Sequence, residues 1–77
     1  MEELLAFLAR ALVDHPDEVE VEGFEEDDGT LVLELHVADE DVGQVIGRGG
    51  RTVNAIRSLL RASSVRQGRR VLVDVVD

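Results

Sequence analysis

The chain has 77 residues, of which 17 are Asp or Glu and eight are Arg, and its formal net charge at pH 7 is −9. Hydrophobic residues make up 44% of the sequence and charged residues 32%, a balance that is typical of folded globular domains and excludes disordered and collagen-like chains. The absence of Cys excludes disulfide bonds, thiolate nucleophiles and cysteine-ligated metal sites. At this length we expect one domain, residues 1–77, with a small hydrophobic core.

The total charge hides a strong polarity along the chain. Residues 1–46 contain 15 acids and one base, a net charge of −14, whereas residues 47–77 contain seven arginines and two acids, a net charge of +5. An evenly acidic chain would repel nucleic acid, so the separation of the charges matters. We expect contact with a polyanion to be confined to the basic half.

The N-terminal sequence lacks the features of an export signal. It begins with Glu2 and Glu3, where a signal peptide needs a basic region, and the longest apolar run is far below the ~20 residues that span a bilayer. We therefore expect a cytoplasmic protein without a membrane partner.

Residues 2–14 are predicted to form an amphipathic helix, because their apolar residues recur at helical spacing. The expected buried stripe consists of Leu4, Leu5, Phe7, Leu8 and Leu12. Pro16 disfavours helical backbone at His15, so the helix should end at about Asp14.

Two strands joined by a hairpin are predicted next. Residues 18–22 alternate strictly between Glu and Val, and Gly23 breaks the alternation, which indicates a bulge or the end of the strand. Asp28 and Gly29 form a pair that is favoured in the closing turn. The second strand, residues 30–37, should bury Leu31, Leu33, Leu35 and Val37.

The C-terminal half is predicted to contain two helices and a strand. Asp39 is a suitable N-cap for a short helix, which ends at the segment 47–50, and a third helix follows at about residues 51–63. The expected buried stripe of the third helix is Val53, Ile56 and Leu60, and Val71, Val73 and Val75 are expected to form the last strand. The predicted order is therefore α-β-β-α-α-β.

The segment Gly47-Arg48-Gly49-Gly50 is the most informative part of the sequence. Glycine at both ends permits a tight turn with positive φ and lets a polyanion approach the main chain. N–H groups at the start of the following helix would then face phosphates, and Arg48 would add a charge-assisted contact. The spacing alone is also compatible with a helix-connecting turn that binds nothing.

The run Val45-Ile46-Gly47-Arg48-Gly49-Gly50-Arg51-Thr52-Val53 resembles the signature of the KH-domain family, Val-Ile-Gly-x-x-Gly-x-x-Ile/Val between two helices. The predicted order of elements is that of the type II KH fold, and the whole chain resembles the small bacterial single-KH proteins of the KhpA type. The resemblance implies an α+β domain whose three-stranded mixed sheet has three helices packed on one face.

The same resemblance implies a function and partners. It implies a non-catalytic single-stranded RNA-binding protein, an RNA chaperone linked to the control of cell shape and of the cell wall. The implied protein partners are a second copy in a homodimer and a larger KH-containing protein of the KhpB/Jag type.

The resemblance also assigns roles to individual residues. Gly47, Arg48, Gly49 and Gly50 would clamp the backbone of about four unpaired nucleotides. The bases would lie in an apolar groove between the edge of the second strand and the short helix, through Val42, Val45 and Ile46. Many relatives have a polar or basic residue where this chain has Gly49, so phosphate binding should depend more on the neighbouring arginines.

The exposed face of the third helix contains further polar residues. Arg51 and Asn54 adjoin the glycine loop and are expected to contact the RNA backbone. Arg57 and Arg61 are expected to pair with acids of a partner or of the first helix. Arg69 and Arg70 are expected to be solvated charges beside the last strand.

The sequence supports neither an enzyme nor a cofactor, since its serines lack a His at useful spacing. His15 and His36 are isolated along the chain, so no metal site is expected. The alternative function is a protein–protein interaction or dimerisation module with a KH fold and little RNA binding of its own. Its expected contact surface is Leu59 with Ala55 and Ala62 beside it.

Overall fold

The computed structural model describes residues 1–76. Its helices are α1 (Glu2–Leu12), α2 (Val42–Ile46) and α3 (Arg51–Arg66), and its strands are β1 (Glu20–Glu25), β2 (Leu31–His36) and β3 (Val71–Val76). Single turns of 3-10 helix lie at Pro16–Glu18, Asp39–Asp41 and Arg48–Gly50. The predicted order α-β-β-α-α-β is confirmed.

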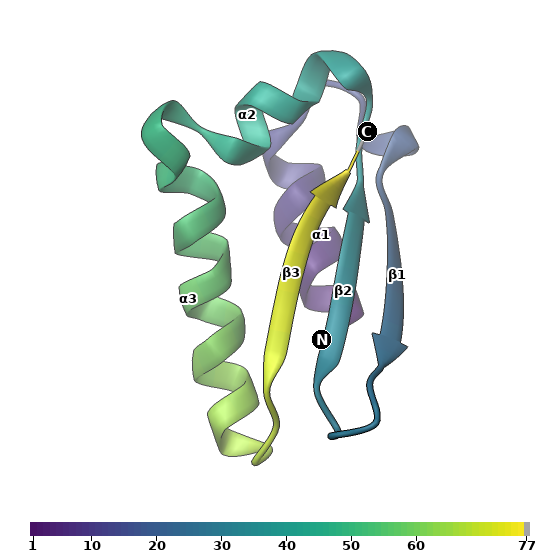
Figure 1. Cartoon of the computed structure of the whole chain (residues 1–77). Coiled ribbons are helices and arrows are strands. Elements are labelled where there is room, and N and C mark those ends of the chain that lie inside the picture. Colours follow the sequence, from purple (N-terminus) through teal and green to yellow (C-terminus); the bar gives the residue numbers. More distant parts are fainter. Residues whose placement is uncertain (77) are drawn as a thin grey trace.

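The three strands form one mixed sheet in the order β1-β2-β3. β1 pairs with β2 antiparallel, and β2 pairs with β3 parallel, so the connection from β2 to β3 crosses over through α2 and α3. Figure 1 shows α1 behind the sheet, α3 beside β3 and α2 above the ends of the strands. The opposite face of the sheet, which is turned toward the viewer, is uncovered. The mixed sheet with its helices on one face is the predicted type II KH architecture.

The core lies between the sheet and the helices. Leu33 and Leu35 of β2 are fully buried, as the alternation of that strand predicts. The buried cluster consists of Leu5, Ala9, Val19, Leu31, Leu33, Leu35, Val37, Val45, Ile56, Leu60, Val71 and Val73. The predicted buried stripe of α3 is confirmed, and this helix continues to Arg66.

The buried face of α1 differs from the predicted stripe. Leu5 and Ala9 are buried, whereas Leu4 and Leu12 are exposed and the Phe7 side chain is 68% exposed. The leucines of this helix fit two stripes one residue apart, and only the contact with the sheet selects between them. The helix also ends at Leu12, before the predicted Asp14.

Neither of the two features expected at Gly23, a bulge or the end of the strand, is present in β1. The pairing register of β1 with β2 runs without interruption from Glu20 to Glu25. A Cβ on Gly23 would lie 2.8 Å from Oε2 of Glu2 and 3.4 Å from Cδ2 of Leu33. The closest of these atoms is the tip of the exposed, flexible Glu2 side chain, so a small movement of that side chain would accommodate a Cβ here. The hairpin that follows is confirmed, with Gly29 at φ +87°.

The longest helix within residues 1–76 is α3, which has 16 residues. None of the helices in this range is both long enough and apolar enough to cross a bilayer.

Candidate nucleic-acid interface

The helix α2 leads into the glycine loop, and a buried carboxylate, that of Asp41, fixes the N-terminal end of the helix. The side chain of Asp41 accepts hydrogen bonds from the backbone N–H of Asp14 at 3.2 Å and of His15 at 3.0 Å. It also pairs with Nδ1 of His15 at 3.1 Å. These bonds tie the segment after α1 to the start of α2.

The contacts of Asp41 shift two pKa values in opposite directions. The hydrogen bond to Asp41 raises the pKa of His15 above 6.5. Burial by itself would raise the pKa of Asp41, but the bonds from Asp14 and His15 outweigh it and hold that pKa below 3.8. A charged pair is therefore favoured at this junction.

The predicted N-cap role of Asp39 is wrong. Asp39 lies in a 3-10 turn and makes no side-chain cap, and α2 begins after Asp41. The side chain of Asp41 is fully buried and turned toward the segment after α1. Because Asp39, Glu40 and Asp41 are three consecutive acids, the sequence does not show which of them fixes the start of α2. Only the tertiary contact with the segment after α1 identifies Asp41.

The other end of α2 is the glycine loop. Gly47, Gly49 and Gly50 have φ of +75°, +63° and +80°. A Cβ on Gly47 would lie 2.8 Å from the backbone N of Thr52, whereas one on Gly49 would meet nothing within 4 Å. The predicted tight turn is thus present, and the Arg48 side chain at its tip is exposed. No side chain caps the start of α3.

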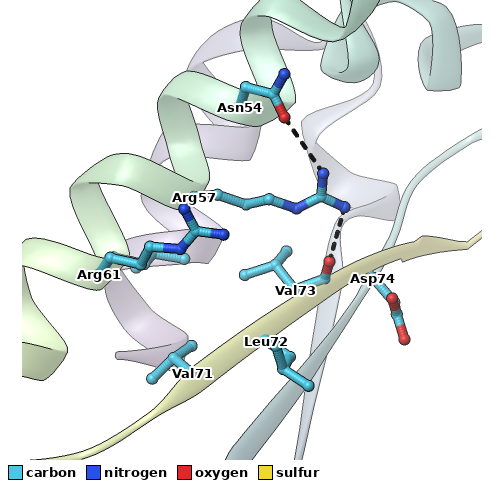
Figure 2. Close-up of a pocket in the computed structure, with 8 residues that line it drawn as sticks. Asn54, Arg57, Arg61, Val71, Leu72, Val73 and Asp74 are labelled. Atoms are coloured by element: carbon cyan, nitrogen blue, oxygen red, sulfur yellow. Dashed lines mark hydrogen bonds between the residues drawn. The ribbon is translucent and has the colours of Figure 1, made fainter.

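A groove of about 320 Å³ runs between α3 and β3, beginning one turn after the loop. It is lined by Asn54, Arg57, Leu60, Arg61, Val71, Leu72, Val73 and Asp74. Figure 2 shows Arg57 reaching from α3 to the strand, where its Nη2 donates to the carbonyl of Val73 at 3.0 Å. Its Nη1 donates to Oδ1 of Asn54 at 3.4 Å. A second hollow of about 550 Å³ adjoins it and shares Arg61, Val71 and Leu72.

The groove lies between α3 and β3, whereas the prediction placed it between the short helix and the second strand. β2 is the central strand of the sheet and has no free edge, so the predicted groove along β2 is wrong. The free edge beside the helices belongs to β3. Parallel pairing of β3 with β2 produces this arrangement, and the sequence does not reveal which strand lies at the edge.

The predicted base-contacting residues of α2 are not equally accessible. Val45 is fully buried in the core, which removes it from the surface. Val42 is half-buried, and the Ile46 side chain is 37% exposed beside the loop. Arg51 and Asn54 are exposed on α3, and Asn54 lines the groove.

The other basic residues near the groove differ from their predicted roles. Arg57 was expected to pair with acids, but it bonds to Val73 and Asn54. Arg61 lines both hollows. Arg69 pairs with Glu25 of β1, Nη2 to Oε1 at 3.2 Å. The spacing of positions 54, 57 and 61 on one helical face was the available signal, but the strand that faces them was unknown.

A mixed three-stranded sheet in this order, with a Gly-x-x-Gly turn between the two helices that cross over it, defines a KH domain of type II. The family model "KhpA/KhpB, KH domain" matches residues 2–75. The chain therefore belongs to the KhpA/KhpB KH-domain family. This is a class of binding domains, so the prediction of a non-catalytic protein is confirmed.

Curated relatives cover almost the whole chain. "RNA-binding protein KhpA" of Halalkalibacterium halodurans is 49% identical over 78 residues, covering 100% of both chains. The protein of the same name from Treponema pallidum is 47% identical, covering 99% of this chain and 94% of its own. That of Clostridium acetobutylicum is 43% identical, covering 99% and 100%.

Proposed function

We propose that this protein binds single-stranded RNA, holding the sugar–phosphate backbone at Gly47–Gly50 and the bases in the groove between α3 and β3. The observation that supports this most directly is that the groove begins one helical turn after the loop. Asn54, one turn of α3 after the loop, already lines the groove. A strand of RNA that enters at the loop can therefore continue along the helix.

The charges of the interface suit a polyanion. Arg48 and Arg51 are exposed at the loop, and Arg57 and Arg61 line the groove. Asp74 is the one acid among the residues that line it. Guanidinium groups form charge-assisted hydrogen bonds with phosphate, so this small basic strip can bind RNA although the chain as a whole is acidic.

The floor and the edge of the groove suit bases. Leu72, which is 43% exposed, provides apolar surface at its edge, and the nearly buried Leu60, Val71 and Val73 form its floor. The carbonyl of Val73 accepts a hydrogen bond from Arg57, so the main chain of β3 can accept donors from the groove. The amino groups of bases are donors of this kind, and edges of unpaired bases are what sequence-reading RNA-binding domains contact.

The wider role that we propose rests on the family alone. The relatives are named RNA-binding proteins. We extend the proposal to an RNA chaperone in the cytoplasm that contributes to the control of cell shape and of the cell wall. A site for about four nucleotides binds weakly by itself, so a second RNA-binding chain, such as a larger KH-containing partner, would raise the overall affinity.

The double substitution Arg48→Asp with Gly49→Asp tests the proposal. A Cβ on Gly49 meets no atom within 4 Å, so the fold should be retained. Repulsion of phosphate should lower affinity for a short single-stranded RNA by more than about tenfold. The matched control is Arg10→Asp with Gly29→Asp, which makes the same charge change at another open positive-φ glycine far from the loop.

Fluorescence anisotropy with a labelled RNA, at two salt concentrations, provides the measurement. The wild type and the control should bind alike, and the logarithm of affinity should fall with that of salt by roughly 0.7 per phosphate contacted. Equal binding by the loop variant, with both variants folded by circular dichroism, would exclude the proposal.

One observation favours the second candidate function, a dimerisation or protein-binding module. The Leu59 side chain is 55% exposed on α3, and Ala55 and Ala62 lie beside it on the side of the helix away from Asn54 and Arg57. Small neighbours leave room for a helix of a second chain to pack there. This surface would be available while RNA occupies the groove.

Sedimentation of Leu59→Glu tests that surface. If the wild type is a dimer through this surface, the variant should be a monomer because a buried, unpaired carboxylate opposes association. The control is Val65→Glu, the same change at an apolar side chain of α3 that is 77% exposed. A dimer that Leu59→Glu leaves undiminished rules the surface out.

A further inference from the structure

The uncovered face of the sheet contains a row of carboxylates. In the pairing register Glu22 of β1 lies opposite Glu34 of β2, and Glu34 lies opposite Asp74 of β3. Residues that pair across strands share a face, so the three side chains point away from the core. Like charges directly opposite each other destabilise a sheet, and a cation between them would reverse that effect.

An imidazole nitrogen lies within this row. His36 follows two residues after Glu34 on the same face of β2, and its Nε2 is 3.6 Å from Oε1 of Glu34. That nitrogen is buried and has no hydrogen-bond partner within the part of the chain that the structure describes. The His36 side chain as a whole is 34% exposed, and an unpartnered ring nitrogen beside a carboxylate can serve as a metal ligand.

The ligand atoms have the spacing of a metal site. One atom each of Glu22, Glu34 and His36 lies within 4.8 Å of the others. In a tetrahedral zinc site with bonds of about 2.0–2.1 Å, neighbouring ligand atoms are roughly 3.3 Å apart. The 3.6 Å between Glu34 and His36 is close to that value, and Glu22 needs only a rotation of its exposed side chain to complete the set.

From this geometry we propose that Glu22, Glu34 and His36 bind one divalent transition-metal ion, with Zn²⁺ the best match. One imidazole and two carboxylates suit Zn²⁺ better than Mg²⁺ or Ca²⁺, which prefer oxygen ligands alone. Asp74, next in the row, adds negative charge beside the ion. The bound ion would join the edge strand β1 to β2 and neutralise part of the acidic face.

The sequence could not indicate this site. His36 has no second His or Cys at ligand spacing along the chain, which is why no metal site was expected. Glu22 and Glu34 come from different strands and meet only through the hairpin register. The three ligands lie on the face of the sheet opposite the helices, and Asp74 is the residue that belongs both to the row and to the lining of the groove.

Isothermal titration of the untagged, chelator-treated protein with ZnCl₂ tests the proposal, with MgCl₂ as the comparison. We expect one Zn²⁺ per chain and no comparable binding of Mg²⁺. Loss of an outer-shell partner weakens metal sites about 10–100-fold, so loss of a ligand in Glu22→Gln or His36→Gln should weaken binding at least that much. The control is Glu40→Gln, which removes an exposed carboxylate outside the row.

Nitrogen-15 NMR of the two imidazoles locates the ion. Addition of one equivalent of Zn²⁺ should shift the ring nitrogens of His36 and leave those of His15 in place. The proposal is overturned if no Zn²⁺ binds, if His15 responds in place of His36, or if both ligand variants bind as the wild type does. Circular dichroism of each variant shows that the substitutions, which lie on the uncovered face, leave the fold intact.

Discussion

The two ends of α2 are built in opposite ways. Before the helix, the buried carboxylate of Asp41 gathers Asp14 and His15, so the junction is closed by polar contacts. After the helix, the turn that begins at Gly47 contains glycines with positive φ and has the exposed Arg48 at its tip. The α3 helix that follows starts without a side-chain cap from Gly50. A five-residue helix cannot be stable by itself, so it depends on the closed end and on Val45 in the core.

The difference between the ends explains how a small acidic protein can present a binding loop. The internal hydrogen bonds of the first junction are already satisfied, and they hold α2 in place. The second junction leaves its main chain near a groove, where a ligand can supply the missing contacts. Substitutions should therefore affect stability at both ends of α2, but RNA binding at only one.

The largest effect should follow from Gly47→Ala. The backbone at this position, φ +75° and ψ 169°, is essentially restricted to glycine and costs other residues of order 1–3 kcal/mol. The added Cβ would also lie 2.8 Å from the backbone N of Thr52, which raises the loss further. Urea unfolding of the variant and the wild type measures this loss in the free energy of unfolding.

The matched control is Gly49→Ala, where the Cβ meets no atom within 4 Å and only the left-handed φ of +63° costs about 1 kcal/mol. Equal losses in the two variants would show that the close approach to Thr52 is relieved by a small movement of the loop. The distinction between Gly47, which is packed against Thr52, and Gly49, which is open, would then be wrong.

The next effect should follow from Asp41→Ala, which leaves the backbone N–H groups of Asp14 and His15 without their acceptor. We expect a clear fall in the midpoint of thermal unfolding, and RNA affinity unchanged in the fraction that is folded. Asp39→Ala is the control, since Asp39 is exposed and makes no cap. If Asp39→Ala destabilised the protein as much as Asp41→Ala, the closed junction would not depend on Asp41.

The smallest effect should be a pH dependence through His15. Its pKa is raised above 6.5 in the folded protein, so its stabilising contribution is complete below pH 6.5 and is lost as the pH rises through the raised value. The pKa of Asp41 is lowered, so its contribution is complete above pH 3.8 and is lost as the pH falls. The pair should therefore stabilise the fold most between these pH values.

Denaturant unfolding from pH 5 to pH 8.5, with a chelator present, measures this dependence. His15→Gln should flatten the decline in stability above pH 6.5. A decline that persists in His15→Gln would assign the titration to another group and remove His15 from the junction.

Much of the fold could be predicted because it depends on local patterns. Alternation in β2, the helical stripe of α3 and the Asp-Gly turn each specify an element within a few residues. The buried face of α1 was not predicted because it depends on how the helix packs on the sheet, and the continuation of β1 through Gly23 was not predicted because it depends on pairing with β2.

The candidate site likewise has a part that local sequence patterns predict and a part that depends on tertiary packing. The tight turn with positive φ at Gly47 and Gly50 was predicted, since it is a property of consecutive residues, whereas the positive φ of Gly49 was not. The predicted groove required a free edge on β2, which is the central strand, and included Val45, which is in the core. The partner strand of α3 depends on the parallel crossover, which no short segment encodes.

By itself the sequence determined the order of elements, the Gly-x-x-Gly turn and a charge of −14 followed by +5. These are sums or short-range patterns, and they suffice to indicate a phosphate-compatible loop in an acidic chain. Only the tertiary structure decided which acid closes the start of α2, that β3 borders the groove, and that Glu22, Glu34 and His36 meet on the uncovered face. Each of these depends on residues far apart in the chain, which strand pairing and helix packing bring within contact distance.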